Sequence, residues 1–182
     1  MCDKMDADDL LEAKVYVGTY RKYNEGSLFG KWLTLSDYSD KEEFYEACNE
    51  LHSDEDDPEL MFQDWEYIPK GLIGESWISE SVFELIEQVD DIKEFDAFMA
   101  FLDFSSYSLE DEELGYLLSK FNDCYQGKYN TEEDYAYEYV DNCYELPEFV
   151  EGYFDYEKFA NTLFMTDYYF DDDTKAVFNR NY

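Results

Sequence analysis

The residues that could carry out chemistry here are one histidine, four cysteines and a large excess of carboxylates. His52 follows a predicted helix and precedes the acidic run Asp54–Asp57. We interpret it as a surface residue or as the C-cap of that helix, rather than as a catalytic group. The cysteines show no CxxC or zinc-type spacing, which favours reduced thiols in a bacterial-type cytoplasm. They are Cys2, Cys48, Cys124 and Cys143.

The sequence lacks the usual signatures of enzymes. There is no GxSxG, no Walker loop, no GxGxxG after a strand and no HExxH. A glycosidase needs two carboxylates at a set separation, but none of the 47 acids stands out as a pair. Neither Asp54–Asp57 nor Asp171–Asp173 has the Gly and the distant Glu of an EF-hand loop. We therefore expect no catalytic residues, no metal and no cofactor.

Charge is the dominant feature of the composition. The 182 residues hold 47 Asp and Glu against 13 Lys and Arg, a formal net charge of -34. Direct binding to nucleic acid is excluded because phosphate contacts need Lys and Arg. A basic protein partner, or solubility in extreme conditions, is favoured instead. Because aromatic residues make up 20% of the chain, we expect it to fold rather than to be disordered.

The acids are spread evenly along the chain. Residues 1–60 hold 17 acids and 6 bases, residues 61–120 hold 15 and 3, and residues 121–182 hold 15 and 4. The three thirds therefore carry -11, -12 and -11. From Glu132 to Glu157 there is no Lys or Arg, although ordinary solvated helices mix both signs. The whole folded body, rather than an acidic tail, is expected to present the charge.

An area estimate sharpens this expectation. A compact protein of this mass exposes about 9,000 Å², which gives one net charge per roughly 270 Å². B-DNA carries one charge per roughly 100 Å² of its cylinder wall. A basic partner that binds DNA would therefore meet a lower charge density on a compact, evenly charged protein than on DNA. To match the density of DNA, the acids would have to gather on one side, or the molecule would have to be elongated.

The first third of the chain predicts a small α+β unit that ends near Pro69. The dozen residues ending near Glu12 are expected to be a loose acidic leader. Lys14–Tyr20 and Leu28–Leu35 are predicted strands around the turn Asn24–Gly26, and Met61–Tyr67 is a third. Between them, Ser39-Asp40-Lys41-Glu42 fits a capping box that opens a helix, and Ser53–Glu59 is predicted to be an acidic loop.

The rest of the chain predicts short amphipathic helices and then a hairpin. Helices are predicted after the caps Ser79 and Asp91, from Ser108, after Thr131 or Asn130, and after Asp155. Asp167–Phe170 and Lys175–Phe178 are predicted strands. No signal peptide or membrane-spanning apolar run is apparent.

Several of these segments together resemble the ArdA family of antirestriction proteins. The resemblance covers the chain from about residue 14 to its end. It rests on Val15-Tyr16-Val17-Gly18, Lys22-Tyr23-Asn24-Glu25-Gly26 with Leu28, Gly30 and Trp32, Asp64-Trp65-Glu66, Phe121–Tyr129 with Glu133-Asp134-Tyr135-Ala136, Tyr153–Ala160 and the hairpin that closes at Phe178.

The resemblance implies a fold and a function. ArdA-type proteins are carried on mobile elements and inhibit type I restriction-modification enzymes by occupying the DNA-binding groove as DNA mimics. The family fold is an elongated α+β chain of three small domains that dimerises through the last. Here we expect an α+β domain at 1–70, a helical domain at 71–107 and a dimerising α+β domain at 108–182. A homodimer would carry about 68 negative charges, as many as roughly 115 Å of duplex.

We predict that the protein-binding surface consists of acids from all three parts. The resemblance implies that the family's antirestriction segment corresponds to the acidic helix around Glu132 to Glu145, near the dimer contact. The predicted residues are Asp54, Glu55, Asp56, Asp57, Asp64, Glu66, Glu84, Glu87, Asp111, Glu112, Glu113, Asp123, Glu132, Glu133, Asp134, Glu138, Asp141 and Glu145.

Three alternatives stay open at this point. The first is an acidic decoy of another basic nucleic-acid-binding protein, of the anti-CRISPR or histone-chaperone kind. The second is a carboxylate enzyme such as a glycoside hydrolase, which would need a cleft with two carboxylates of raised pKa. The third is a halophilic protein whose acidic surface serves solubility alone.

Overall fold

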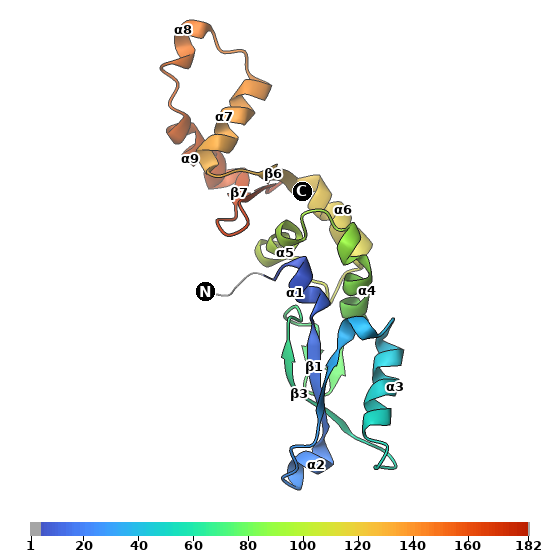
Figure 1. Ribbon diagram of the computed structural model, residues 1–182. Helices are drawn as coiled ribbons and strands as arrows, with labels where there is room; N and C mark the ends of the chain where they lie inside the picture. The colour runs from blue at the N-terminus through green and yellow to red at the C-terminus, as the bar shows by residue number, and fades with distance from the viewer. Residues whose placement is uncertain (1–4, 182) are drawn as a thin grey trace. The chain divides into compact units, whose positions relative to one another are not determined.

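The computed structural model describes residues 5–181 and shows a mixed α+β chain with small antiparallel sheets (Figure 1). The chain divides into two compact units. Unit 1 takes in the chain up to Asp96 together with Tyr107–Leu117, and unit 2 takes in Ala97–Ser106 and the chain from Leu118 onward. The predicted α+β class is confirmed, while the division into three domains stays a prediction.

Unit 1 is built around a three-stranded antiparallel sheet of order β2-β1-β3. A second, two-stranded sheet pairs β4 with β5. The elements in chain order are α1 (Ala7–Leu11), β1 (Lys14–Thr19), α2 (Tyr20–Asn24), β2 (Lys31–Thr34), the 3-10 turn η1 (Leu35–Asp37), α3 (Lys41–Leu51), β3 (Leu60–Glu66), β4 (Ile73–Gly74), β5 (Trp77–Ile78), α4 (Glu80–Gln88) and the 3-10 turn η2 (Val89–Asp91).

The central strand β1 takes its place because its side chains alternate. Val15 and Val17 are fully buried, while Tyr16 between them lies on the other face. Tyr16 pairs with Trp32 of β2, and the two ring centroids are 5.5 Å apart. A register shift on the β3 side of β1 falls between Tyr16 and Val17.

Helix α3 covers one face of this sheet (Figure 1). Its buried Phe44 lies 5.8 Å from the ring of Phe62 in β3 and 5.9 Å from Phe83 in α4. Its N-cap is Asp40, which accepts a hydrogen bond from the Glu43 N–H, while the Glu43 carboxylate accepts bonds from Ser39. The predicted helix start is thus correct, but the capping pair is Asp40 and Glu43.

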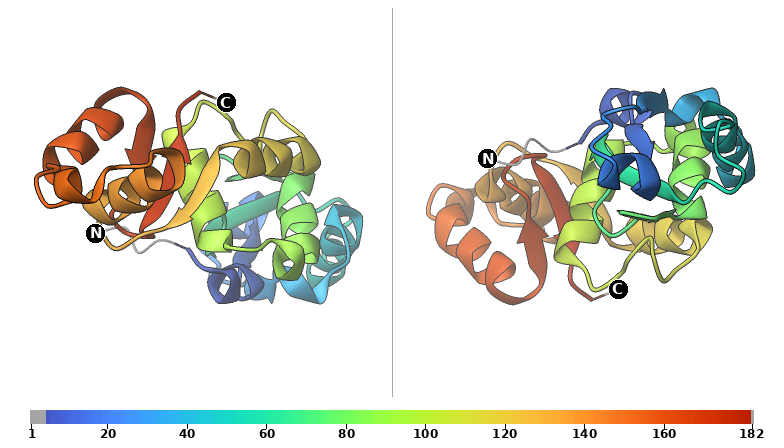
Figure 2. Two further views of the ribbon diagram at one scale, coloured as in Figure 1. Left: turned by 90° about the horizontal axis from the view of Figure 1, so that it is seen from above. Right: turned by 90° about the horizontal axis from the view of Figure 1, so that it is seen from below.

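Unit 2 combines helices with a three-stranded antiparallel sheet of order β6-β8-β7. In both views of Figure 2 the orange and red chain folds back so that α7 and α9 lie side by side. Helices α5 (Phe95–Phe104) and α6 (Leu114–Cys124) each begin in unit 1 and end in unit 2. The later elements are β6 (Tyr125–Lys128), α7 (Glu132–Cys143), α8 (Glu148–Glu151), α9 (Tyr156–Thr166), β7 (Tyr168–Phe170) and β8 (Ala176–Asn179).

Aromatic residues supply much of the core of unit 2. One cluster joins α7, α9 and the hairpin through Tyr135, Phe164 and Tyr168. Another surrounds the fully buried Phe178 of β8, whose ring lies 5.0 Å from Phe104. The predicted caps of α7 and α9 are confirmed, since Thr131 and Asp155 accept bonds from N–H groups of the first turns.

The prediction of a loose leader is wrong for the residues that the structure describes; Cys2 lies outside them. Helix α1 begins after Asp6, whose carboxylate accepts from the Asp9 N–H while the Asp9 carboxylate accepts from the Asp6 N–H. This reciprocal capping satisfies two orphan N–H groups, and Leu10 on the same helix is fully buried. The acids here are therefore capping residues as well as charge carriers.

Two predicted helix starts are also wrong. Asp91 does not cap α5, because it lies in the η2 turn and Glu94 has a left-handed backbone with φ of 57°. A helix cannot continue through that conformation, so α5 begins at Phe95. Ser108 instead holds a turn, where its N–H donates to Glu112, and α6 begins only at Leu114.

Several short elements were not predicted. Helix α2 stands where the turn after the first strand was expected, and the return strand begins at Lys31 rather than Leu28. Strands β4, β5 and β6 and the one-turn helix α8 have no periodic pattern long enough to reveal them.

We expect Leu10→Ala to lower the free energy of unfolding by about 2–5 kcal/mol, because it leaves a cavity under α1. Chemical denaturation followed by tryptophan fluorescence would measure it. Leu28→Ala is the matched control, since Leu28 is 87% exposed. Equal, small effects of the two substitutions would show that the leader is loose after all.

Candidate functional site

The predicted surface acids lie mostly in solvent. Of the eighteen, fifteen are exposed, while Glu55, Glu112 and Glu132 are partly buried. Unit 1 carries those up to Glu113, and unit 2 carries those from Asp123 onward. Each unit therefore presents its own set of carboxylates.

Helix α7 shows why so many acids can share one helix. Tyr135, Ala136 and Val140 are buried, so their helical spacing turns Glu138 and Asp141 outward. The first turn carries Glu132, Glu133 and Asp134. Negative charge is favourable there because the helix dipole is positive at its N-terminus.

Glu132 differs from its neighbours because it is half-buried. Burial raises the pKa of its carboxyl group, and the nearby charge of Asp172 raises it further. Both residues line a cavity of about 490 Å³ in unit 2, together with Glu133, Glu157 and Lys175. Glu132 therefore has the raised pKa that a glycoside hydrolase would need in one of its carboxyl groups. The enzyme hypothesis requires two such carboxyl groups in one cleft.

Within residues 5–181, three of the predicted acids pair with a lysine: Glu66 with Lys14, and Asp54 and Glu55 with Lys22. The Glu66 carboxylate lies 2.8 Å from the Lys14 ammonium, and this hydrogen bond raises the pKa of Lys14. The Asp54 carboxylate accepts a hydrogen bond from Lys22 at 2.7 Å, which lowers the pKa of Asp54. Such exposed pairs reduce the local charge without contributing much to stability.

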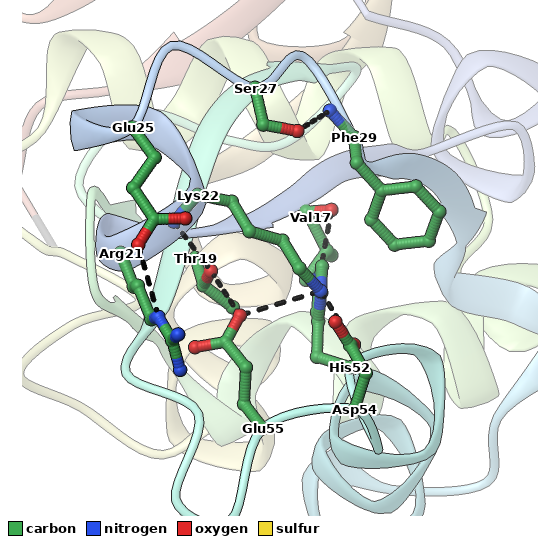
Figure 3. A network of polar contacts seen from close by, with 10 residues as sticks. All are labelled: Val17, Thr19, Arg21, Lys22, Glu25, Ser27, Phe29, His52, Asp54 and Glu55. Atoms are coloured by element: carbon green, nitrogen blue, oxygen red, sulfur yellow. Dashed lines mark hydrogen bonds and ion pairs between the residues drawn. The ribbon is translucent and has the colours of Figure 1, made fainter.

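A cluster of polar side chains in unit 1 surrounds Lys22 (Figure 3), and we call it the Lys22 network. Besides Asp54, the ammonium reaches Nδ1 of His52 at 3.0 Å and the Glu55 carboxylate at 3.4 Å. Glu55 also accepts from the Thr19 hydroxyl at 2.8 Å, and its side chain is only 6% exposed. The network thereby ties α2 and β1 to the loop after α3.

Hydrogen bonding and packing determine the tautomer and the charge of His52. Because the Lys22 ammonium donates to Nδ1, the proton of the neutral ring belongs on Nε2, which faces the Val17 carbonyl at 3.4 Å. Phe29 packs edge-on against the ring and also lies under the Lys22 ammonium. Burial, and then the charge of Lys22, lower the pKa of His52. The neutral form is therefore favoured in the folded protein.

His52 is the C-cap of α3, as one of the two sequence interpretations held, but it is fully buried and so is not a surface residue. Nothing in the sequence revealed Lys22, Thr19 and Phe29 as its partners. The signal that could have found them is the rarity of basic residues, since each Lys in so acidic a chain is expected to lie near several carboxylates.

Carboxylates and imidazole are metal ligands, and potential ligand atoms of His52, Asp54 and Glu55 lie within 4.8 Å of one another. The Lys22 ammonium already contacts all three residues. The cluster is therefore satisfied by a cation of its own chain.

The thiols within the described residues are free. Cys48 and Cys124 are buried, and burial raises the pKa of each thiol to about 12. Such thiols are poor nucleophiles because the thiolate is the reactive form. Cys143 at the end of α7 is exposed.

We expect Lys22→Met to destabilise unit 1 by about 2 kcal/mol, because it leaves the Glu55 carboxylate without a counter-charge. The loss is smaller than for a fully buried pair because the Lys22 side chain keeps 12% of its exposure. Thermal and denaturant unfolding would measure it, with Lys31→Met at an exposed position as the control. A Lys22→Met protein as stable as that control would contradict the role of the network.

The His52 pKa gives a pH prediction. The ordinary value is 6.5, and the folded value is lower, so below about pH 6.5 the unfolded chain binds a proton that the folded chain does not. Stability contributed by neutral His52 is present above pH 6.5 and is lost as the pH falls. We expect the difference in unfolding free energy between wild type and His52→Gln to shrink from pH 7.5 to pH 5.5. A constant difference over this range would contradict it.

Comparison with known proteins identifies the family to which the chain belongs. Within the described residues no helix is long and apolar enough to cross a membrane. No curated protein matches the chain at a significant level. The sequence does match the antirestriction protein family ArdA over residues 15–176, nearly its whole length. The resemblance seen in the motifs is thereby confirmed: the chain belongs to the ArdA family of antirestriction proteins, whose members are inhibitors.

Proposed function

We propose that the protein inhibits type I restriction-modification enzymes by occupying their DNA-binding groove as a mimic of duplex DNA. The observation that carries the proposal is membership of an antirestriction family in a chain with 47 acids and only 13 bases. Lysine and arginine side chains that have evolved to meet phosphates would meet carboxylates instead. Counterions would be released from both surfaces, as they are when DNA binds.

The exposure of the predicted acids supports this mechanism. Carboxylates such as Glu84, Glu133 and Asp141 lie in solvent, where a partner can reach them. Glu55 is the exception, since Lys22 and Thr19 engage its buried carboxylate. We therefore leave Glu55 out of the proposed contact surface and assign it to the internal support of that surface.

The field of many acids, rather than any one contact, is proposed to steer the encounter. Association then speeds up at low ionic strength and slows as salt screens the charges. We further propose that two copies associate through residues 108–182 and act on the enzyme in the bacterial cytoplasm. No step of this mechanism requires a catalytic group, a metal or a cofactor.

The direct test measures DNA cleavage by a purified type I restriction complex with increasing protein. We expect full inhibition at micromolar protein, relief of inhibition as salt rises through the moderate range, and no effect of calcium chelation. No inhibition at micromolar excess would overturn the proposal. The same assay with an unrelated basic DNA-binding enzyme tests the alternative of a general decoy. A general decoy would inhibit that enzyme and the type I restriction complex equally.

Charge-neutral variants test the mechanism of the inhibition. Because the field is shared, each single change such as Glu84→Gln should weaken inhibition by no more than about fivefold. Neutralising Glu133, Asp134 and Glu138 together should weaken it more, and the slope of inhibition against salt should fall. A single variant that abolishes inhibition without unfolding would show that one contact, and not the field, carries the binding.

A further inference from the structure

Unit 2 holds a second cavity, of about 610 Å³, between α7, the chain that follows it and the start of α9. Figure 1 shows this part of the chain as a loop that runs from α7 through α8 to α9. We call the cavity the tyrosine groove, after the residues that line it. They include Tyr137, Asp141, Tyr144, Glu145, Glu151 and Tyr156.

The tyrosines give the groove aromatic walls that solvent can reach. The rings of Tyr137 and Tyr156 lie 5.0 Å apart between centroids. Tyr137 is 60% exposed and Tyr144 is 54% exposed, which is high for such large side chains. The face of a tyrosine ring carries partial negative charge and attracts cations.

Among the residues that the structure describes, no Lys or Arg pairs with the carboxylates of the groove. From residue 129 to residue 157 the sequence holds no Lys or Arg. No ion pair among the described residues involves Asp141, Glu145 or Glu151. Their charge also reaches the tyrosines: the pKa of Tyr156 is raised by burial first, and the charges of Glu151 and Asp141 add to the rise. The groove is therefore negative and unneutralised, unlike the Lys22 network of unit 1.

We propose that the tyrosine groove receives an arginine side chain of the protein partner, in a part of residues 108–182 that the proposed association of two copies leaves open. This step rests on the proposed function and makes it more specific. A guanidinium group is planar, so it stacks on tyrosine rings while its N–H groups pair with carboxylates. A groove with both kinds of wall offers both interactions at once. The mimicry of phosphate by a spread of acids is then supplemented by one localised pocket.

A metal ion fits this groove poorly. Within residues 5–181, the one place where three potential ligand groups converge is the cluster of His52, Asp54 and Glu55 in unit 1. The acids of the groove do not converge in that way. A cavity of about 610 Å³ also lies in the range of sites that enclose organic groups.

Gly152 offers a way to fill the groove without changing its charge. It lines the cavity, its φ is -69°, and a Cβ added to it meets nothing within 4 Å. Gly152→Leu should therefore add a bulky side chain to the wall of the groove and narrow it without straining the backbone. Gly115→Leu on α6 is the matched control, because a Cβ there also meets nothing within 4 Å and Gly115 does not line the groove.

The first experiment follows amide and tyrosine-ring NMR signals of the full chain during titration with N-acetylarginine amide. We expect saturable shifts centred on Tyr137, Tyr144 and Gly152. The neutral analogue N-acetylcitrulline amide should cause none. The shifts should be lost in Gly152→Leu and retained in Gly115→Leu.

A second variant guards against misfolding of the first. Asp141→Asn, Glu145→Gln and Glu151→Gln together should also remove the localised shifts. The control triple Glu42→Gln, Glu46→Gln and Glu50→Gln on α3 changes the net charge equally and should retain them. Shifts spread evenly over exposed acids, equal shifts with citrulline, or tighter localised binding of spermidine than of the arginine probe would overturn the proposal.

The restriction assay then connects the groove to function. We expect the Gly152→Leu protein to need about tenfold more concentration for half inhibition, and the Gly115→Leu protein to match wild type. Wild-type inhibition that Gly152→Leu leaves unchanged would overturn the role of the groove while leaving the proposed function intact. Absence of inhibition by wild type, with localised arginine binding still present, would overturn the proposed function alone.

Discussion

Like-charge repulsion is the constraint on which the rest of this structure depends. A net charge of -34 opposes every compact arrangement of the chain, and only 13 basic residues are available to offset it. The fold meets this constraint with aromatic packing. Phe44, Phe62 and Phe83 join helices to the sheet in unit 1, while rings around Tyr135 and Phe178 do so in unit 2. Aromatic side chains bury large apolar areas, so relatively few of them can stabilise a small unit.

The same constraint explains where the cations lie. Lys22 is placed beside Glu55, whose carboxylate is buried and would be costly to leave alone. Lys14 and Arg21 pair with exposed carboxylates, where a cation contributes little to stability. Repulsion among the exposed acids elsewhere is screened by solvent, and the helix dipole stabilises the acids in the first turns of α3 and α7. Neutralisation within the chain is therefore strongest at the buried carboxylate of Glu55, and the outer acids keep their charge.

Features that depend on nearby residues could be predicted from the sequence. The caps Ser79, Thr131 and Asp155 begin helices as expected, because capping is a local hydrogen bond followed by an amphipathic pattern. The start of α5 could not be predicted, since the residue type of Glu94 does not indicate its left-handed backbone. Strand β6 pairs with β8, which lies some fifty residues later in the chain, so its pairing cannot be predicted from nearby residues. Strands β4 and β5 are two residues each, which is too short for a periodic pattern. Helix α1 could not be predicted, because an Asp that caps a helix cannot be told by its residue type from an Asp that only carries charge.

The candidate site likewise combines features that the sequence predicts with features that depend on tertiary structure. Exposure of acids such as Asp134 or Asp141 follows from their place opposite the buried face of α7, and helical periodicity is enough to predict it. The burial of Glu55 depends on Lys22 and Thr19, more than thirty residues away, and sequence spacing carries no trace of it. The tyrosine groove lies between these cases. Of its acids, Asp141 and Glu145 were predicted and Glu151 was not. The cavity itself exists only because α9 returns beside α7 and brings Tyr156 to Tyr137. A field of many charges attracts any basic protein, whereas a shaped pocket for one side chain discriminates among them, so specificity in this chain would arise from tertiary structure and not from composition.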